Sequence, residues 1–312
     1  MSVFSATLNQ IGILALFIVA GFVLSRLKFV PDNAQTVLSK LENTLLIPAM
    51  VLGTFMGNFT VGKLTVAWKL LLGSALLGVV AIGLALLCVR FCSKDRYMRN
   101  IYTYGLSFSN FGFMGNAVVS ALFPDVFLEY LIFTMPLWTF IYLWGVPVLL
   151  LGDSDKKTTW KERLKNFANP MFISMILGMI IGLFDIPVPG FIGSAVETAG
   201  NCMPPVAMLL TGMTIAQFDL REILKIKSVY LVTALRLLAF PLLFLGFIAV
   251  VPLERTFATS ALCALAMPLG LNTIIIPGAL GKDTKVASGM VLVSHMASCL
   301  TIPVIFMIFS IV

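Results

Sequence analysis

The feature that most limits what this chain can fold into is a series of long uncharged segments. Residues 70–89, between Lys69 and Arg90, are an example, because they include only apolar or small side chains. A helix needs about 20 such residues to cross the hydrocarbon core of a bilayer. Charged residues make up 11% of the chain, whereas soluble domains carry about 25%. The sequence therefore predicts an all-α integral membrane protein in the lipid bilayer, without a separate soluble domain.

Apolar segments of membrane-spanning length recur along the whole chain. They predict ten transmembrane helices near residues 8–25, 36–57, 66–91, 99–123, 127–151, 169–185, 191–216, 226–252, 256–280 and 284–311. The second span is polar at its start, and the sixth is short.

Basic residues predict how these spans are oriented. Sixteen of the 21 lysines and arginines fall in alternate loops, whereas only Lys63, Lys69 and Arg255 fall in the others. The sixteen are Arg26, Lys28, Arg90, Lys94, Arg96, Arg99, Lys156, Lys157, Lys161, Arg163, Lys165, Arg221, Lys225, Lys227, Lys282 and Lys285. Positive loops stay in the cytoplasm. We therefore expect a multi-pass protein of the cell inner (cytoplasmic) membrane with both termini on the outer side.

Neither the net charge of +7 nor the five cysteines indicates a further kind of partner. The basic residues lie in short loops without the interleaved aromatic residues of a nucleic-acid site, so we expect no nucleic acid. The cysteines have no metal-ligand spacing and are expected to be small buried apolar residues. No metal and no cofactor are predicted, apart from a coupling proton or sodium ion.

The two halves of the chain are similar at unusual positions. A shift of 156 residues superimposes the pairs Pro31/Pro187, Pro48/Pro204, Asn116/Asn272 and Pro147/Pro303. Five helices are an odd number, so a second copy enters the membrane from the opposite face. The sequence predicts two inverted five-helix repeats, residues 1–156 and 157–312, a common architecture of secondary transporters.

Spans 4 and 9 contain residues that interrupt a helix at related positions. Span 4 holds the sequence SNFGFMGN from Ser109 to Asn116, and span 9 holds MPLGLNT from Met267 to Thr273. Proline and paired glycines favour unwinding, and unwound backbone inside a membrane must line protein or a wet cavity. The half-helices that follow present N-terminal amides, which suit a carboxylate. Packing kinks are the alternative.

These motifs, the ten spans and the basic fifth loop resemble the auxin efflux carrier family, which includes bacterial organic-acid permeases and plant PIN-type carriers. The resemblance covers essentially the whole chain. It implies that spans 1, 2, 6 and 7 form a scaffold, that spans 3–5 and 8–10 form a moving transport unit, and that spans 4 and 9 are broken helices that cross at the substrate site. It also implies a homodimer with contacts through spans 2 and 7.

By the same resemblance, Asn110 matches the crossover asparagine that contacts the substrate carboxylate, and Pro268 matches the crossover proline of span 9. The predicted substrate-binding residues are Asn110, Gly112, Asn116, Pro268, Asn272, Thr273 and Arg236. Ser109 and Thr273 stand where the plant carriers have proline, and Asn272 replaces an apolar residue. These differences predict a more polar pocket and a small hydrophilic acid, not an indole.

Few ionisable residues lie inside the predicted spans, and each is a functional candidate. Arg236 in span 8 either attracts an anion at long range or clamps helices through their carbonyls. His295 in span 10, the single histidine, and Glu197 in span 7 are candidates for proton coupling. Lys40 and Glu42 are expected at the cytoplasmic interface, with their charged ends reaching water.

We therefore expect a non-enzymatic secondary transporter that moves a small organic anion, a malate- or malonate-like mono- or dicarboxylate, by alternating access. A sodium-coupled bile-acid-type symporter, a proton antiporter and a non-transporting ligand sensor are the alternatives. An antiporter would need paired carboxylates near the crossover, which spans 4 and 5 lack. An enzyme would need a converging cluster of His, Cys or carboxylates, and the breaks contain none.

The orientation can be tested with single cysteines in a background without the native cysteines. Ser154→Cys, in the basic loop 5–6, should react with a membrane-impermeant maleimide only after the cells are opened. Thr60→Cys, in loop 2–3, should react in intact cells and serves as the control. Labelling of Ser154→Cys in intact cells would invert the predicted topology.

Overall fold

The computed structural model describes residues 3–151, 159–165, 167–217 and 225–311. Helices account for 84% of the structure, and the described residues include no β-strand. The predicted repeat boundary at 156/157, together with Ser154, Lys156, Lys157 and Arg221, lies outside the described residues.

The chain forms α-helices with short segments of wider or tighter turn, here labelled η, between them. In order they are α1 (Val3–Arg26), α2 (Ala34–Leu41), η1 (Glu42–Leu46), α3 (Ile47–Asn58), α4 (Val61–Cys92), α5 (Arg96–Ser107), η2 (Phe111–Gly115), α6 (Asn116–Leu122), η3 (Pro124–Val126), α7 (Phe127–Phe140), η4 (Ile141–Leu150), α8 (Trp160–Lys165), α9 (Pro170–Leu183), α10 (Gly190–Asn201), α11 (Met203–Ala216), α13 (Lys227–Ala234), η5 (Leu235–Ala239), α14 (Phe240–Val250), α15 (Arg255–Ala266), α16 (Asn272–Ala279) and α17 (Lys285–Phe309).

Four helical stretches of the described residues are long and apolar enough to cross a membrane unaided. They are Val61–Cys92, Pro124–Leu150, Lys227–Val250 and Lys285–Phe309. These correspond to predicted spans 3, 5, 8 and 10. Shorter apolar helices, Ile11–Arg26, Phe111–Leu122 and Pro170–Leu183, fall within predicted spans 1, 4 and 6. The structure is thus a helical, multi-pass membrane protein.

The remaining predicted spans are divided into shorter helices. Span 2 consists of α2, η1 and α3, and span 7 consists of α10 and α11. Spans 4 and 9 stop being helical at their central motifs, between Ser107 and Phe111 and between Ala266 and Asn272. Ten spans in two inverted repeats therefore stay a prediction.

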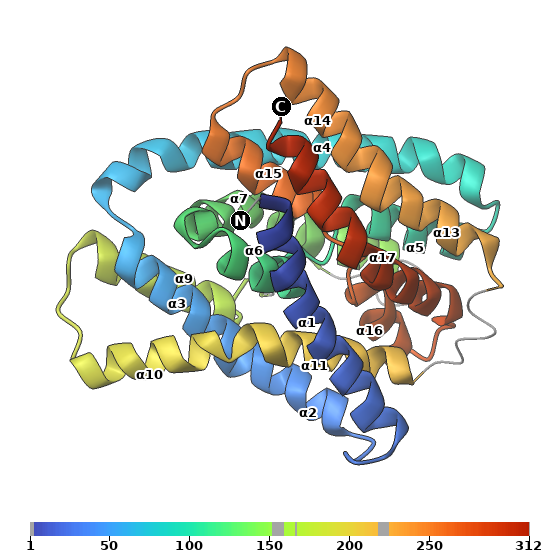
Figure 1. Cartoon of the computed structure of the whole chain (residues 1–312), viewed down its shortest axis with the longest axis horizontal. Helices are drawn as coiled ribbons and strands as arrows, with labels where there is room; N and C mark the ends of the chain where they lie inside the picture. Colours follow the sequence, from blue (N-terminus) through green and yellow to red (C-terminus); the bar gives the residue numbers. More distant parts are fainter. Residues whose placement is uncertain (1–2, 152–158, 166, 218–224, 312) are drawn as a thin grey trace.

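The helix ends that carry many of the basic residues gather on one side of the molecule. The C-terminal ends of α1 and α4 and the N-terminal ends of α13 and α17 lie on the right of Figure 1, whereas the α3–α4 and α9–α10 connections lie on the left. The alternation of basic and less basic loops in the sequence thus becomes a charge difference between two ends of the helical bundle.

Two helix pairs pack closely because glycines lie at their contacts. A Cβ atom at Gly21 of α1 would lie 2.1 Å from the Leu209 carbonyl oxygen of α11, and one at Gly212 would lie 1.9 Å from that of Ile18. The α3–α9 pair is similar, with Gly182 against the backbone of Phe55. Small residues at such contacts let helix backbones approach in a membrane, where apolar burial does not drive association.

The interrupted spans occupy the core of the protein. Every residue from Ile101 to Ser107 in α5 and from Ala258 to Ala266 in α15 is buried. By contrast, apolar side chains such as Leu76, Phe91 and Phe247 are exposed on the outside, as expected of a lipid-facing surface. Irregular backbone is tolerated at membrane depth only where protein or water surrounds it, and here protein does.

The expectation for Glu42 was wrong. Its side chain is completely buried at the start of η1, and neither carboxylate oxygen has a hydrogen-bond partner among the described residues. Lys40, two residues earlier, is exposed as expected. Wider π-helical turns shift the following side chains around the axis, and the sequence pattern did not predict η1. A second buried carboxylate, Glu129 of α7, forms an ion pair with Lys63 of α4.

The glycine contact of α1 with α11 can be tested within one helix. Gly21→Ala should destabilise the folded protein by about 1–3 kcal/mol, because the added methyl overlaps a backbone oxygen that cannot move alone. Gly12→Ala, in the same helix with nothing within 4 Å of its Cβ, should be neutral or slightly stabilising. Thermal unfolding in detergent compares them, and equal melting temperatures would contradict the close contact.

Candidate functional site

The two interrupted spans cross in the protein interior and are joined there by backbone hydrogen bonding. Ser109 and Leu269 form an isolated antiparallel bridge, and the Asn110 N–H donates to the Pro268 carbonyl over 2.7 Å. The Ser109 hydroxyl also donates to the Ala264 carbonyl over 2.6 Å. Residues 155–160 positions apart in the chain thus meet in two short extended segments, which are called the crossing strands below although they form only an isolated bridge.

Local sequence explains why each helix ends where it does. Met267 precedes a proline, which disfavours the helical conformation, and it adopts extended backbone with φ −71° and ψ 148°. Phe108 is extended as well, with φ −122° and ψ 107°. Helical structure resumes at Phe111 and at Asn272. Each crossing strand is therefore preceded by a helix C-terminus and followed by a helix N-terminus.

Arg236 of η5 binds the carbonyl groups at both helix C-termini. Its Nη1 donates to Leu106 at the end of α5 over 2.8 Å, and its Nη2 donates to Ala264 near the end of α15 over 3.0 Å. Its Nε lies 3.3 Å from the Met267 carbonyl oxygen. These carbonyls lack intrahelical partners, and a cation matches the negative end of the helix dipole. Of the two roles considered for this buried arginine, the observed contacts are those of the helix clamp.

Asn110 is held by the single histidine. The Asn110 Nδ2 lies 3.0 Å from His295 Nε2, and His295 Nδ1 lies 2.7 Å from the Val291 carbonyl oxygen within α17. Both side chains are buried. Next to them, the Ser294 hydroxyl accepts a hydrogen bond from the Leu269 N–H over 3.2 Å. Helix α17 therefore supports both crossing strands.

Asn272, the first residue of α16, donates from Nδ2 to the Tyr104 hydroxyl of α5 over 3.0 Å. Asn110 and Asn272 line one small cavity, with a volume of about 20 Å³, which is room for about one water molecule. The full lining is Tyr104, Ser109, Asn110, Phe111, Gly112, Phe113, Trp138, Ile141, Gly270, Leu271 and Asn272.

The predicted binding residues divide between this cavity and its supports. Asn110, Gly112 and Asn272 line the cavity, and a Cβ at Gly112 would lie 2.5 Å from the Trp138 ring. Asn116 is buried at the start of α6, outside the lining. The Thr273 hydroxyl donates to the Gly270 carbonyl over 2.8 Å. Pro268 accepts a hydrogen bond from Asn110 through its carbonyl, and Arg236 binds the carbonyls at the helix ends. Neither residue lines the cavity, and both hold the backbone that does.

The aromatic walls of the cavity were not predicted by any motif in the sequence. Trp138 of α7 contacts Phe111 edge-on, with ring centroids 5.0 Å apart, and stacks on Tyr142 at 5.6 Å. Tyr104 lies on α5, in the same interrupted span as Phe111, and contacts Phe108 with ring centroids 5.1 Å apart. Neither Tyr104 nor Trp138 belongs to a motif, so only an alignment of related sequences would have indicated them.

A larger cavity of about 810 Å³ lies between α1, α3, α10 and α11 on one side and α6, η3 and α7 on the other. Glu197, the second coupling candidate, lines it together with Asn58 and Asn201. Glu197 is exposed there. His295 does not line this cavity, and its side chain instead contacts Asn110 of the small cavity. The two coupling candidates therefore lie in different surroundings.

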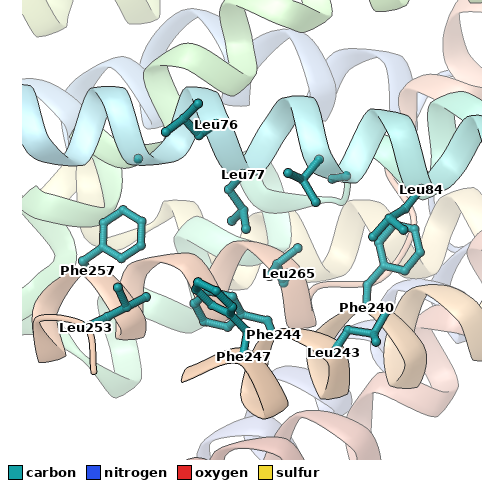
Figure 2. Close-up of a pocket in the computed structure, with 13 residues that line it drawn as sticks. Leu76, Leu77, Leu84, Phe240, Leu243, Phe244, Phe247, Leu253, Phe257 and Leu265 are labelled. Atoms are coloured by element: carbon teal, nitrogen blue, oxygen red, sulfur yellow. The ribbon is translucent and has the colours of Figure 1, made fainter. Parts of the chain in front are cut away.

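A third cavity, of about 400 Å³, has an entirely apolar lining (Figure 2). Leu76, Leu77 and Leu84 of α4 face Phe240, Leu243, Phe244 and Phe247 of α14, with Leu253, Phe257 and Leu265 completing the wall. Its side chains offer no hydrogen-bond donor for an anion.

In the described part of the chain, His, Cys, Asp and Glu side chains form no group of three that could hold a metal ion.

Replacing Arg236 tests its clamping role. Arg236→Met should lower the melting temperature strongly, because each buried carbonyl that loses its donor costs about 1–3 kcal/mol. Arg236→Lys should rescue only part of this loss, since an ammonium group lacks the planar fork that spans two helix ends. Arg90→Met, at an exposed arginine near the end of α4, is the control and should unfold like the wild type. A normal melting temperature for Arg236→Met would contradict the clamp.

Comparison with known proteins adds one finding. No curated protein matched this sequence. A family model described as membrane transport protein, which is that of the auxin efflux carriers, matches residues 7–306. Because the match covers nearly the whole chain, this protein belongs to the auxin efflux carrier family of membrane transporters.

Proposed function

We propose that this protein is a secondary transporter that binds the carboxylate of a small organic anion at the crossing of spans 4 and 9. The observation that carries the proposal is the shared cavity between Asn110 and Asn272, one amide from each interrupted span. Each of these amides donates one hydrogen bond to the protein, which leaves further hydrogen-bonding capacity for a ligand.

Helix dipoles support an anion rather than a cation. The negative C-terminal ends of α5 and α15 are covered by the Arg236 guanidinium. The positive N-terminal ends, at Phe111 and Asn272, border the cavity and have no such covering charge. Helix N-termini bind anions through their free N–H groups and the dipole. Arg236 therefore contributes to anion binding by cancelling the opposing ends of the dipoles.

The cavity lining favours a monocarboxylate over a dicarboxylate. None of the lining residues is charged, and the amides of Asn110 and Asn272 suit one carboxylate group. A second carboxylate would face Trp138, Phe111 or Ile141, where a buried charge without a partner is costly. Besides the two asparagines, Ser109 and Tyr104, the lining is apolar or aromatic, which favours an acid with a compact apolar or planar tail over the small hydrophilic acid predicted from the sequence.

Alternating access explains why the site is small and the neighbouring cavity large. The 20 Å³ cavity does not hold an organic acid until its walls move. The larger cavity lies between α1, α3, α10 and α11, which belong to the predicted scaffold, and α6 and α7, which belong to the predicted transport unit. A slide of one unit along the other would change which side of the membrane the crossing faces.

The packing of the scaffold helices supports the inverted repeat on which this mechanism depends. Span 1 packs on span 7 through α1 and α11, and span 2 packs on span 6 through α3 and α9. The predicted repeat relates span 1 to span 6 and span 7 to span 2. The pair of spans 1 and 7 is therefore the repeat-related counterpart of the pair of spans 6 and 2. The larger cavity is lined by Asn58, Pro124 and Gly193, at helix ends opposite to the basic ones, so we assign it to the outer side.

Binding can be measured by thermal shift on the purified protein, with acetate, lactate, benzoate, malonate and malate, each with and without sodium. We expect monocarboxylates to raise the melting temperature more than dicarboxylates do at equal concentration. Asn110→Ala and Asn272→Ala should each weaken binding by about 10- to 150-fold, since a hydrogen bond to a charged ligand contributes about 1.5–3 kcal/mol.

Asn116→Ala is the matched control, because Asn116 is a buried asparagine of the same motif outside the cavity. It should bind as the wild type does. If Asn110→Ala and Asn272→Ala remain folded and bind like the wild type, the crossing is only structural and the substrate binds elsewhere. Counterflow of the bound acid in liposomes then separates transport from ligand sensing.

A further inference from the structure

The hydrogen bonds around His295 determine where its proton lies. The Val291 carbonyl oxygen can only accept, so the Nδ1 atom 2.7 Å away carries the ring proton. In the neutral ring Nε2 then has a free lone pair and accepts from the Asn110 amide nitrogen 3.0 Å away. Neutral His295 therefore fixes the orientation of the Asn110 side chain.

This orientation matters because Asn110 lines the crossing cavity. One of the two N–H groups on its Nδ2 donates to His295, and among the described residues nothing donates to its Oδ1. The amide thus holds its NH₂ group toward the ring, so a carboxylate would find one remaining N–H beside an acceptor oxygen instead of a whole NH₂ group. A proton on Nε2 reverses the arrangement, because an imidazolium donates from both nitrogens. The amide then turns over, its oxygen accepts from Nε2–H, and its NH₂ group becomes available to the anion.

In the described part of the chain, the helices packed against α17 carry no carboxylate that could balance such a charge. The described helices that contact α17 are α1, α5, α11, α13, α14, α15 and α16, together with η2 and η5. Their charged or titratable side chains, with those of α17 itself, are Arg26, Arg96, Tyr97, Arg99, Tyr102, Tyr104, Lys227, Tyr230, Arg236, Arg255, Cys263, Lys285, Cys299 and His295. All the charged groups besides His295 are basic, and a buried cation without a partner is unfavourable.

We propose that His295 carries a proton together with the substrate anion, so that transport is a one-to-one proton symport of a monocarboxylate. The Nε2 atom takes the proton from water on the side where the anion binds and releases it to water on the other side. The anion supplies the missing counter-charge, and the proton turns the Asn110 amide toward the anion. Each ligand favours the binding of the other, as thermodynamic linkage requires.

This inference rests on the proposed carboxylate site, and the single histidine makes it directly measurable. The full chain, purified without a histidine tag and labelled with ¹⁵N-histidine, gives the ring nitrogen signals of His295 alone. Between pH 6 and 8 without ligand, we expect the neutral ring with its proton on Nδ1. Saturation with benzoate, which stays ionised in this range, should convert the ring to the doubly protonated form at pH 6.

Binding measured against pH gives a second test. In the wild type, the Kd for benzoate should rise roughly tenfold per pH unit where the anion takes up one proton. In His295→Gln, which keeps an acceptor for Asn110 but cannot be protonated, the Kd should change less than about twofold from pH 6 to 8. Glu197→Gln, in the larger cavity, is the control and should keep the wild-type slope.

The outcomes separate this inference from the function on which it rests. A ligand-free ring protonated on Nε2 overturns the inference, as does a ring that stays neutral when benzoate is bound. A wild-type slope in His295→Gln also overturns it, and loss of the slope in Glu197→Gln moves the coupling to Glu197. If none of the five acids stabilises the wild-type protein, the proposed site itself fails.

Discussion

Everything at the centre of this protein depends on supplying hydrogen bonds to backbone that is not helical and is out of reach of water. A helix ends just before each crossing strand, and the last carbonyls of that helix have no intrahelical donor. Lipid offers no donors for them either. Arg236 supplies three of these donors from one guanidinium group, and the Asn110–Pro268 hydrogen bond joins the strands to each other. One buried cation therefore makes an interrupted fold possible.

The same arrangement determines the electrostatics of the site. In the proposed anion site, Arg236 covers the negative helix ends and leaves the ends at Phe111 and Asn272 uncovered. Positive potential there would come from the backbone, because no charged side chain lines the cavity. A site of this kind can bind an anion without holding it too tightly, because no fixed ion pair has to be broken on release.

The proposed sliding mechanism assigns rigidity and mobility to different parts of the bundle. Glycine contacts lock α1 to α11 and α3 to α9 at the backbone, so these helices are suited to remain fixed. The crossing strands pack instead against side chains, including Trp138 and those of α17. The cavity of about 810 Å³ lies where the two groups of helices meet, at the surface across which the proposed sliding motion would occur.

The sequence by itself determined the membrane environment, the long helices and the positions of both interruptions, because apolar length, basic loops and Met267-Pro268 are local signals. It also singled out Asn110 and Asn272 through the interrupted motifs and the family resemblance, and Arg236 and His295 as rare ionisable residues inside apolar segments. Only the tertiary structure decided what these residues do. In the folded protein, His295 contacts Asn110, and Arg236 donates to backbone carbonyls. The side chain of Glu42 is buried, and Trp138 and Tyr104 line the cavity. Such contacts join residues far apart in the chain, where hydrophobic periodicity carries no information about partners.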